Sequence, residues 1–346
     1  MPRPETIAIA AGSGPSRVLV NAPLGNLPLY LPPAKTVILT DARVRRLYGK
    51  SFPDAAAVLL AGTGERQKSL RRVEALYRRL LELGVDRSSF ILAIGGGLVC
   101  DIAGFTASTF LRGIPFAFVP TTLLAQVDAA IGGKNGVNFL GFKNMIGLVR
   151  QPRFVLCDLE VLRTLPARQR AGGFAEVIKA AAIADLSLFK YLEQYRAELR
   201  RLDMAPLTRA IASTVRVKAG IVARDELESG ERKKLNFGHT LGHALELTHK
   251  LPHGRAVSIG MALAADISVR RKRLAASDAL RLKNLLEGYG LPTRCPFNRA
   301  AILSSLRRDK KKNENRLNLV LLRSLGQACL ETVDFQELEE YVHDLC

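Results

Sequence analysis

The histidines of this chain are concentrated in one short segment. Four of the five lie between Leu235 and Gly254, namely His239, His243, His249 and His253. On a helix, residues four apart share a face, so His239 and His243 would lie together, and Gly238 and Gly242 would let another backbone approach closely. Imidazoles gathered on one face are ligands for a divalent metal such as zinc. Ordinary half-buried or surface histidines are the alternative, since no HExxH glutamate accompanies them. We favour the metal interpretation.

A glycine-rich turn is the second candidate for chemistry. Gly95–Gly97 follow an apolar strand pattern and precede a helical one, so backbone N–H groups at a helix N-terminus could bind a phosphate. Asp41 ends an earlier strand pattern, and Thr121 and Thr122 follow another. Each feature alone also fits an ordinary tight turn, and the run is not a GxGxxG fingerprint. At successive strand ends, together they favour a nucleotide crossing the carboxyl edge of a sheet.

The elements that would position these residues change in type along the chain. Short apolar segments predict strands at 17–20, 36–41, 56–62, 90–97, 116–122 and 154–158. Helical patterns cover 65–84, 171–202, 205–226, 236–250 and 256–273, followed by a short extended pair within 317–333 and a last helix over 335–345. We therefore expect a Rossmann-like α/β domain with a mostly parallel sheet in residues 1–165. A mainly α-helical, metal-binding domain would follow in residues 166–346.

Composition narrows the class of protein. The chain has 346 residues, 48% of them hydrophobic, and a net charge of +19 with a pI near 10.1. We favour an anionic ligand plus a basic surface over a nucleic-acid partner, because no nucleic-acid-binding motif is present. No apolar run reaches the roughly eighteen residues of a membrane span, and the N-terminus does not resemble a secretory signal. Five cysteines without a CxxC pair fit a reducing cytoplasm.

Seven sequence blocks follow one another along the chain. They are GERQKS (64–69), GGGLVCDIAGF (95–105), FLRGIPFAFVPTTLLAQVDAAIGGKNGVN (110–138), KNMIG (143–147), GGFAEVIK (172–179), LNFGHTLGHALE (235–246) and HGRAVSIGM (253–261). In this order they resemble the 3-dehydroquinate synthase family of sugar-phosphate cyclases. The resemblance implies a dehydroquinate synthase-like fold and an NAD- and metal-dependent lyase. Such an enzyme converts 3-deoxy-arabino-heptulosonate 7-phosphate to 3-dehydroquinate and phosphate. Transient oxidation by NAD, phosphate elimination, reduction and an intramolecular aldol closure would follow one another.

The same resemblance implies a metal site for zinc or cobalt. Its ligands would be Glu176, His239 and His253, which leaves open positions for substrate hydroxyls. The metal would acidify the hydroxyl to be oxidised and polarise the resulting ketone. His243 matches a pocket residue that transfers protons or binds phosphate, and not a ligand. Spacing alone paired His239 with His243, whereas the resemblance pairs His239 with His253 as metal ligands and makes His243 a pocket residue.

The resemblance also implies a substrate pocket and an NAD site. A substrate with a carboxylate and a phosphate needs several fixed cations. The implied catalytic and pocket positions are Arg112, Asp128, Lys134, Asn144, Lys179, Lys218, Arg232, Asn236, His243 and Lys311. The implied NAD positions are Asp41, Glu65, Lys68, Gly96, Gly97, Asp101, Thr121, Thr122, Lys143 and Thr164. Arg112 resembles a residue that reaches a neighbouring subunit's site, which implies a homodimer. Asn236 would share the metal-site face if the helix of His239 already includes it.

Three positions depart from the family pattern. The stretch 139–142 is FLGF where the family has a Pro-x-Gly segment, which changes the allowed backbone angles just before Lys143 and Asn144. Asn135 replaces a threonine, and Cys100 replaces a glycine after the phosphate turn. A related cyclase that makes a cyclitol is therefore the second hypothesis. A polyol dehydrogenase of related architecture and a basic nucleic-acid-binding protein are more distant alternatives.

Overall fold

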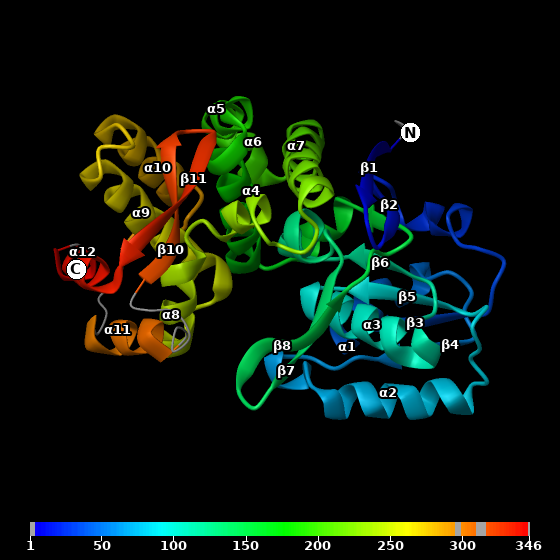
Figure 1. Ribbon diagram of the computed structural model, residues 1–346. Coiled ribbons are helices and arrows are strands. Elements are labelled where there is room, and N and C mark those ends of the chain that lie inside the picture. Colours follow the sequence, from blue (N-terminus) through cyan, green and yellow to red (C-terminus); the bar gives the residue numbers. More distant parts are fainter. Residues whose placement is uncertain (1–3, 295–298, 309–315, 345–346) are drawn as a thin grey trace. The chain divides into compact units, whose positions relative to one another are not determined.

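The chain folds into two compact units, each described by itself below. The computed structural model describes residues 4–294, 299–308 and 316–344. The first unit contains residues 1–166 and 207–227, and the second contains 167–206 and 228–346 (Figure 1). The first break thus falls one residue from the expected boundary at 165/166. Residues 207–227 were expected in the second domain, but they pack with the first unit.

The first unit is built on a seven-stranded sheet. Its strands are β1 (Glu5–Ala11), β2 (Gly14–Val20), β3 (Thr36–Thr40), β4 (Ala57–Leu60), β5 (Phe90–Gly95), β6 (Phe116–Pro120) and β9 (Val155–Cys157). They are arranged in the order β1-β2-β9-β6-β5-β3-β4, and all neighbours are parallel except β1 and β2. All six predicted strands are present, and the predicted mostly parallel α/β fold is confirmed.

A separate hairpin, β7 (Lys134–Phe139) and β8 (Phe142–Val149), extends from this unit (Figure 1). Neither this hairpin nor β1 was predicted. β8 is exposed or half-buried along its whole length. Because neither of its faces is buried in a core, its sequence need not be an apolar run or alternate strictly between apolar and polar residues. By contrast, β3, β5 and β6 are buried at every position. Central parallel strands covered on both faces read as continuous apolar runs, which is why the sequence revealed them.

The helices of the first unit flank this sheet. They are α1 (Ala42–Tyr48), α2 (Leu70–Glu82), α3 (Gly97–Thr109) and α7 (Met204–Arg224), which lies within residues 207–227 except for its first three residues. The helix predicted over 65–84 begins only at Leu70. The Ser69 hydroxyl accepts a hydrogen bond from the Arg72 N–H and caps it. Residues 65–67 instead form a separate 3-10 turn, η3 (Glu65–Gln67).

The second unit is mainly helical, as predicted. Its elements are α4 (Ala167–Ala184), α5 (Leu186–Gln194), α6 (Arg196–Arg201), α8 (His239–His249), α9 (His253–Arg270), α10 (Ala276–Gly288), α11 (Arg299–Arg308), β10 (Arg316–Ser324), β11 (Gln327–Asp334) and α12 (Phe335–Asp344). The helical pattern predicted over 171–202 is confirmed, and it is divided among three helices, α4, α5 and α6. Asp185 ends the first by capping the second, its carboxylate accepting the Leu188 N–H at 2.9 Å. The β10–β11 pair and α12 match their predictions, whereas α10 and α11 were missed.

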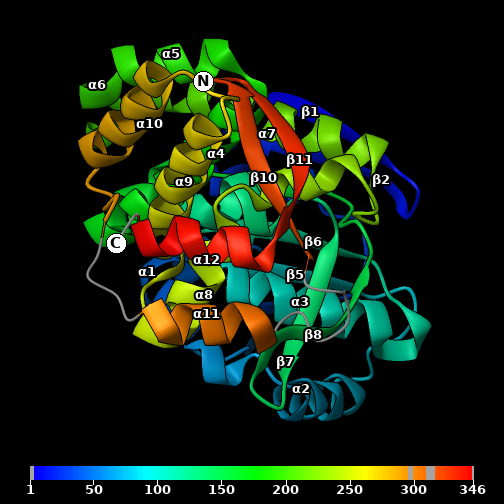
Figure 2. The same ribbon diagram turned by 60° about the vertical axis from the view of Figure 1, so that its left-hand side comes forward.

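Glycines set the packing of α8 on α9. A Cβ added to Gly242 would lie 3.2 Å from the Ala256 backbone, and one added to Gly260 would lie 1.9 Å from the Gly238 carbonyl oxygen. The close backbone approach expected at Gly238 and Gly242 is therefore confirmed. The core beneath this pair includes Leu245 and Ile259 together with apolar residues of β10, β11 and α12. Figure 2 shows the β10–β11 hairpin running along α9, with α12 beside α11.

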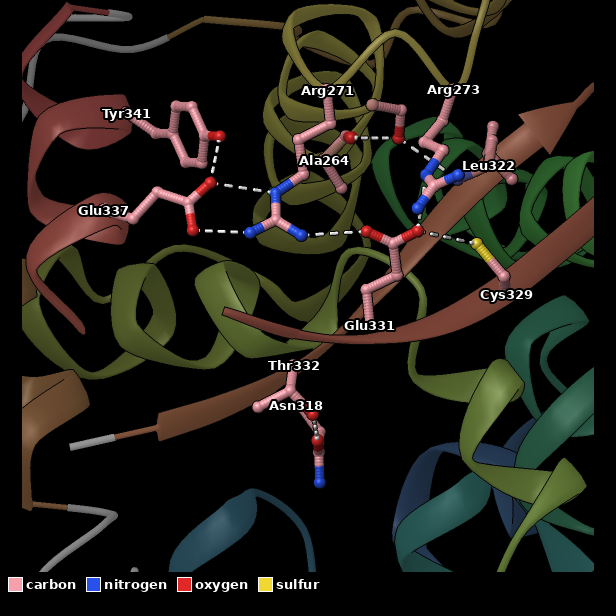
Figure 3. A network of polar contacts seen from close by, with 11 residues as sticks. Ala264, Arg271, Arg273, Asn318, Leu322, Cys329, Glu331, Thr332, Glu337 and Tyr341 are labelled. Carbon is pink, nitrogen blue, oxygen red and sulfur yellow. Dashed lines mark hydrogen bonds and ion pairs between the residues drawn. The ribbon is translucent and has the colours of Figure 1, made fainter. Parts of the chain in front are cut away.

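A polar network fastens the end of α9 to the hairpin and to α12. The Arg271 guanidinium binds the Glu331 carboxylate at 2.8 Å and the Glu337 carboxylate at 2.9 and 2.5 Å (Figure 3). Arg273 binds the other oxygen of Glu331 at 2.7 Å. Such bidentate, partly buried pairs orient the three elements toward one another.

Among the described residues, no helix combines the length and the apolar character needed to span a bilayer.

Candidate active site

Three ligand-type side chains meet in the second unit. Glu176 comes from α4, His239 is the first residue of α8 and His253 is the first residue of α9. Their ligand atoms all lie within 4.8 Å of one another. Glu176 Oε1 is 3.2 Å from His253 Nε2 and 3.8 Å from His239 Nε2. Bonds of about 2.0–2.1 Å in a tetrahedral zinc site place donor atoms roughly 3.4 Å apart. The three side chains therefore fit an ion of that size.

Glycine contacts explain why these residues converge. A Cβ added to Gly254 would lie 2.4 Å from Gly172 Cα, so the backbones of α4 and α9 touch beside His253. Glu176 follows Gly172 by one helical turn and so lies on the same face of α4. At the start of α8, Gly238 takes φ +76°, which breaks the chain direction just before His239. Glycines thus allow the close backbone contacts and the chain reversal that bring α4, α8 and α9 together at the ligand cluster.

The electrostatic surroundings keep two of the ligands ready for a cation. Burial alone would raise the pKa of Glu176, but the Lys179 ammonium and the two imidazoles outweigh it and lower that pKa well below its usual range. Burial first, and then the charge of Lys179, lower the pKa of His239 to about 3. At neutral pH, Glu176 is therefore ionised and His239 is neutral. His239 Nδ1 lies 3.1 Å from the Phe237 carbonyl, which holds the proton there and leaves Nε2 free to coordinate.

His253 lies between two carboxylates. Its Nε2 faces Glu176, and its Nδ1 is 2.5 Å from Oε1 of the buried Glu246. Burial alone would lower the pKa of His253, but the contacts with Glu176 and Glu246 outweigh it and raise the pKa to about 10. A proton would thus have to leave before a metal binds, as is usual for histidine ligands. Glu246 was missed by the sequence analysis, although it lies within the block LNFGHTLGHALE (235–246) that carries the resemblance.

His243 lies beside the cluster without joining its three converging ligand atoms. Its ring centroid is 5.3 Å from that of His239 and 6.5 Å from that of His253, and its side chain is exposed on α8. His243 also belongs to a second group of ligand-type residues, with Glu246 and His253. His239 and His243 do share a helix face, as their spacing indicated.

The other residues predicted for the substrate pocket in this unit lie in different elements and are buried to different extents. Lys179 is buried against Glu176, and Arg232 is buried in the 3-10 turn η7 (Glu231–Asn236). Asn236 ends that turn and donates to Glu228 at 2.5 Å. The condition under which Asn236 would share the helix face of His239 is not met, because Gly238 interrupts the helix first. Lys311 lies outside the described residues.

The first unit places several of its predicted nucleotide-binding residues at one edge of the sheet. β3, β5 and β6 are adjacent and parallel, so Asp41, Gly95–Gly97 and Thr121 lie at neighbouring carboxyl ends. The chain passes from β3 to β4 on one side and returns to β5 on the other, which makes the gap between β3 and β5 a topological switch point. In open α/β sheets, such points are where ligands bind.

Backbone geometry at this edge suits a phosphate. Gly96 is the N-cap of α3, so no side chain of that residue shields the N–H groups of the first turn. A Cβ added to Gly96 would lie 3.1 Å from Thr122 Cγ2, and one added to Gly97 would lie 3.0 Å from Ala129 Cβ. Asp41 caps α1, one carboxylate oxygen accepting the Val44 N–H at 2.9 Å. Its second oxygen is not part of that bond and can accept a ribose hydroxyl.

A buried lysine links a residue predicted to bind NAD with one predicted for the substrate pocket. Lys68 is buried, forms an ion pair with Asp101 on α3 and donates to the Asn144 side chain on β8. Burial raises the pKa of Asp101 to about 6, against the opposing effect of Lys68. Glu65 accepts a hydrogen bond from Asn138 at 2.7 Å. The β7–β8 hairpin is thus tied to η3 near its turn, next to the FLGF stretch that departs from the family pattern.

Other predicted residues of the first unit lie at its surface or in local pairs. Lys218 on α7 donates to the Asp128 carbonyl at 2.7 Å and forms an ion pair with its carboxylate. Thr164 is exposed, and its hydroxyl lies 2.6 Å from that of Tyr48. Exposed positions also hold Lys134, Lys143 and Arg112. The structure thus brings Lys218 and Asp128 together. Within the described part of the chain, the side chain of Thr164 is hydrogen-bonded to Tyr48 and to the Val161 carbonyl, and not to the glycine turn.

Two of the departures from the family pattern have structural explanations. Asn135 is buried on β7, where its side chain donates to the Gly133 carbonyl at 2.7 Å and to the Arg150 carbonyl at 3.0 Å. Cys100 is buried in α3 and packs as a small apolar residue. Both positions therefore serve packing and local hydrogen bonding, and neither removes a candidate ligand.

Solved structures with the same fold define the class of protein. The chain superimposes with a TM-score of 0.86 on 2-deoxy-scyllo-inosose synthase complexed with carbaglucose-6-phosphate, NAD+ and Co2+, at 26% identity over 98% of this chain and 100% of the other. The TM-score is again 0.86 for 2-epi-5-epi-valiolone synthase from Streptomyces hygroscopicus subsp. jinggangensis 5008 with NAD+ and Zn2+ bound, at 29% identity over 95% and 96%. Both are sugar-phosphate cyclases, so the chain has the fold of that class.

Sequence comparison identifies the family within that class. The 3-dehydroquinate synthase N-terminal family matches residues 58–171, and the 3-dehydroquinate synthase C-terminal family matches residues 173–312. A 3-dehydroquinate synthase from Halorhodospira halophila is 44% identical over 311 residues, 88% of each chain. The chain belongs to the 3-dehydroquinate synthase family. The resemblance, the lyase activity and the function predicted from the sequence are thereby confirmed.

Proposed function

We propose that this enzyme converts 3-deoxy-arabino-heptulosonate 7-phosphate to 3-dehydroquinate and phosphate with NAD and a divalent metal, zinc or cobalt. The observation that carries the proposal is the cluster of Glu176, His239 and His253, whose donor spacing fits such an ion. The two similar cyclase structures hold NAD+ with Co2+ or Zn2+. The higher identity to 3-dehydroquinate synthases than to those two cyclases favours this substrate over a cyclitol precursor.

The metal residues have separate tasks in this proposal. Glu176, His239 and His253 hold the ion, which when bound would acidify a substrate hydroxyl and polarise the ketone formed from it. Lys179 balances the charge of the buried Glu176 carboxylate and keeps it ionised. The exposed imidazole of His243, beside the cluster, accepts and returns a proton or binds the substrate phosphate.

The NAD residues act mainly through backbone and through fixed polar groups. Gly96 and Gly97 let the α3 N-terminus bind the dinucleotide phosphates, and NAD when bound accepts and returns a hydride. Asp41 and the two threonines after β6 provide oxygen atoms for ribose and phosphate. Further contacts come from Glu65, Lys68, Asp101, Lys143 and Thr164. This assignment is supported by their positions at, or hydrogen-bonded beside, the edge of the sheet, except for Lys143 and Thr164, which rest on the family resemblance.

The substrate is anionic, so fixed cations and amides are needed to bind it. We assign this task to Lys134, Lys179, Lys218, Arg232 and Lys311, with Asp128, Asn144 and Asn236 as polar partners. Burial of Lys179, Lys218 and Arg232 supports the assignment, because a buried cation is held in one geometry and is weakly screened.

We extend the proposal to the biological context. The exposed Arg112, held at φ +65°, would reach the substrate site of a second subunit, so the enzyme would work as a homodimer.

An odd number of cysteines, of which the three described are free and buried, supports a reducing cytoplasm. The reaction would serve the shikimate pathway and aromatic amino acid biosynthesis. The basic surface would remain solvated without binding nucleic acid. An NAD-binding domain and a metal- and substrate-binding domain would share this work.

A phosphate-release assay tests the proposed function. The purified protein is stripped of metal, supplied with the heptulosonate phosphate and NAD, and assayed before and after zinc or cobalt is restored. We expect phosphate release only with metal, and no net accumulation of NADH, because the hydride is returned in each turnover. Absence of phosphate release with metal restored contradicts the proposal. Release from another sugar phosphate instead would establish the cyclitol-forming alternative, and net NADH would indicate a dehydrogenase.

A further inference from the structure

The environment of His253 contains a carboxylate that the proposed metal site does not use. Glu246 Oε1 lies 2.5 Å from His253 Nδ1, on the opposite side of the imidazole from Glu176. Glu246 is on α8 and His253 begins α9, so the contact joins the two helices that carry the histidine ligands. The side chain of Glu246 is only 4% exposed. Burying a carboxylate is costly unless a hydrogen-bond donor satisfies it, and His253 is such a donor.

The two nitrogens of His253 therefore have different partners. When Nδ1 carries a proton and donates it to Glu246, the lone pair of Nε2 points toward the Glu176 carboxylate. An imidazole oriented in this way presents the correct tautomer to a metal and is more basic than a free one. His239 shows a parallel arrangement, with Nδ1 directed at the Phe237 carbonyl. Both histidine ligands thus have an acceptor on the nitrogen that faces away from Glu176.

We propose that Glu246 is a positioning residue that accepts the Nδ1 proton of His253 and directs Nε2 of that ligand toward the metal. This inference rests on the proposed metal site and goes beyond its three ligands. The second possible arrangement, in which Glu246 itself coordinates an ion with His243 and His253, would use Nδ1 of His253 as the donor atom. The two arrangements need opposite tautomers of His253, so they predict different results for the same variants.

Metal affinity measured by competition with a chromophoric chelator provides the test. Zinc and cobalt are titrated into the metal-free full-length protein, without substrate, for wild type, Glu246→Ala and Glu246→Gln. We expect Glu246→Ala to weaken metal binding about 10- to 100-fold while the stoichiometry stays at one ion per chain. We expect Glu246→Gln to recover most of the loss, because its amide oxygen still accepts the Nδ1 proton. The visible absorption of bound cobalt should keep its wild-type form in Glu246→Gln.

Glu331→Ala is the matched control. Glu331 is also a partly buried carboxylate of the second unit that bridges elements, through Arg271 and Arg273 (Figure 3). We expect this substitution to lower the thermal stability without changing metal affinity. Unchanged metal affinity in Glu246→Ala, or a loss no larger than in Glu331→Ala, overturns the inference. If Glu246→Ala fails to fold, Glu246→Gln decides. Loss of metal from Glu246→Gln as complete as from Glu176→Ala would make Glu246 a ligand and would overturn the positioning role.

Glu176→Ala separates failure of this inference from failure of the proposed function. Metal retained at wild-type affinity in Glu176→Ala contradicts the proposed metal site itself. Metal lost in Glu176→Ala but bound normally by Glu246→Ala contradicts only the role of Glu246.

Discussion

The ligand cluster of the second unit and the sheet edge of the first unit are built from different materials. The cluster consists of side chains, and each is held by a second group, as His239 is by the Phe237 carbonyl and Glu176 by Lys179. The sheet edge consists mostly of backbone, at the ends of β3, β5 and β6 and at the first turn of α3. A small cation needs donor atoms at fixed distances, whereas a dinucleotide phosphate needs N–H groups and room to approach.

This difference predicts which kind of substitution damages each region. Removing a side chain should disable the cluster, whereas adding one should disable the edge. Substitutions of charged groups outside the ligand cluster should affect catalysis or stability without changing metal binding. The following experiments test that contrast in order of decreasing expected effect.

Glu176→Ala should have the largest effect. It removes one ligand and breaks the buried ion pair with Lys179, and breaking a buried ion pair from one side costs about 3–5 kcal/mol of stability. We expect loss of bound metal after dialysis, measured by elemental analysis, together with loss of turnover. Glu193→Ala, which breaks a more exposed pair with Arg281, is the control and should retain metal. Full metal content in Glu176→Ala would refute the cluster as a metal site.

Lys218→Met should reduce turnover while leaving metal affinity unchanged. Lys218 is buried and paired with Asp128, and we assign it to substrate binding. Loss of one fixed charge-stabilising group typically lowers kcat on the order of 100-fold. Arg216→Met on the same helix is the matched control, because Arg216 pairs with Glu5 at the surface. Equal turnover in the two variants would show that Lys218 has only a structural role.

Asp101 should give the first unit a pH-dependent stability. Its pKa is raised to about 6 by burial, opposed by Lys68, whereas an unfolded aspartate titrates near pH ~3.9. The folded state thus binds the proton more tightly, so the stabilisation is present below about pH 4 and is lost as the pH rises through about 6. Relative to Asp101→Asn, the wild type should lose about 2 kcal/mol of unfolding free energy between pH 4 and 7. Parallel stability curves in urea titrations would contradict this assignment.

Gly96→Ala should weaken NAD binding and spare the metal. The added methyl group would lie 3.1 Å from Thr122 Cγ2, in the space where a phosphate approaches the α3 N-terminus. A displacement of this size in a backbone cradle should lower NAD affinity about tenfold, which corresponds to about 1.4 kcal/mol. Gly25→Ala is the control, because a Cβ there meets nothing within 4 Å. Calorimetric titration with NAD measures both variants, and equal affinities would remove Gly96 from the binding site.

The sequence predicted the parts of the fold that depend on local pattern and burial. The central strands appeared as apolar runs because both of their faces are covered. The helical pattern over 171–202 did not show that three helices share this segment, because Asp185 was not recognised as a cap. The packing of 207–227 with the first unit depends on distant contacts, such as those of Glu226 with Ser13 and Gln151. The periodicity of α7 does not reveal them, because Glu226 lies beyond Arg224, the last residue of that helix.

The candidate site was predictable where residue type and family motif agreed. Spacing alone paired His239 with His243, and only the wider motif indicated Glu176, which lies 63 residues before His239 in the sequence. Asn236 was placed on the helix only on the condition that the helix included it, and the positive φ of Gly238 cannot be read from glycine identity alone. Glu246 escaped notice because its function depends on its contact with His253 across two helices.

The retention of metal by His239→Ala and His243→Ala, compared side by side, tests the central claim most directly. Both residues lie on one face of α8. His239 directs a ring nitrogen at Glu176, at 3.8 Å, and belongs to the group of Glu176 and His253, whereas His243 is grouped with Glu246 and His253. After dialysis against a weak chelator, we predict that His239→Ala holds no zinc or cobalt. His243→Ala should still hold one ion per chain while its turnover is lost. Equally complete loss of metal from both variants would contradict the assignment of Glu176, His239 and His253 as the ligands.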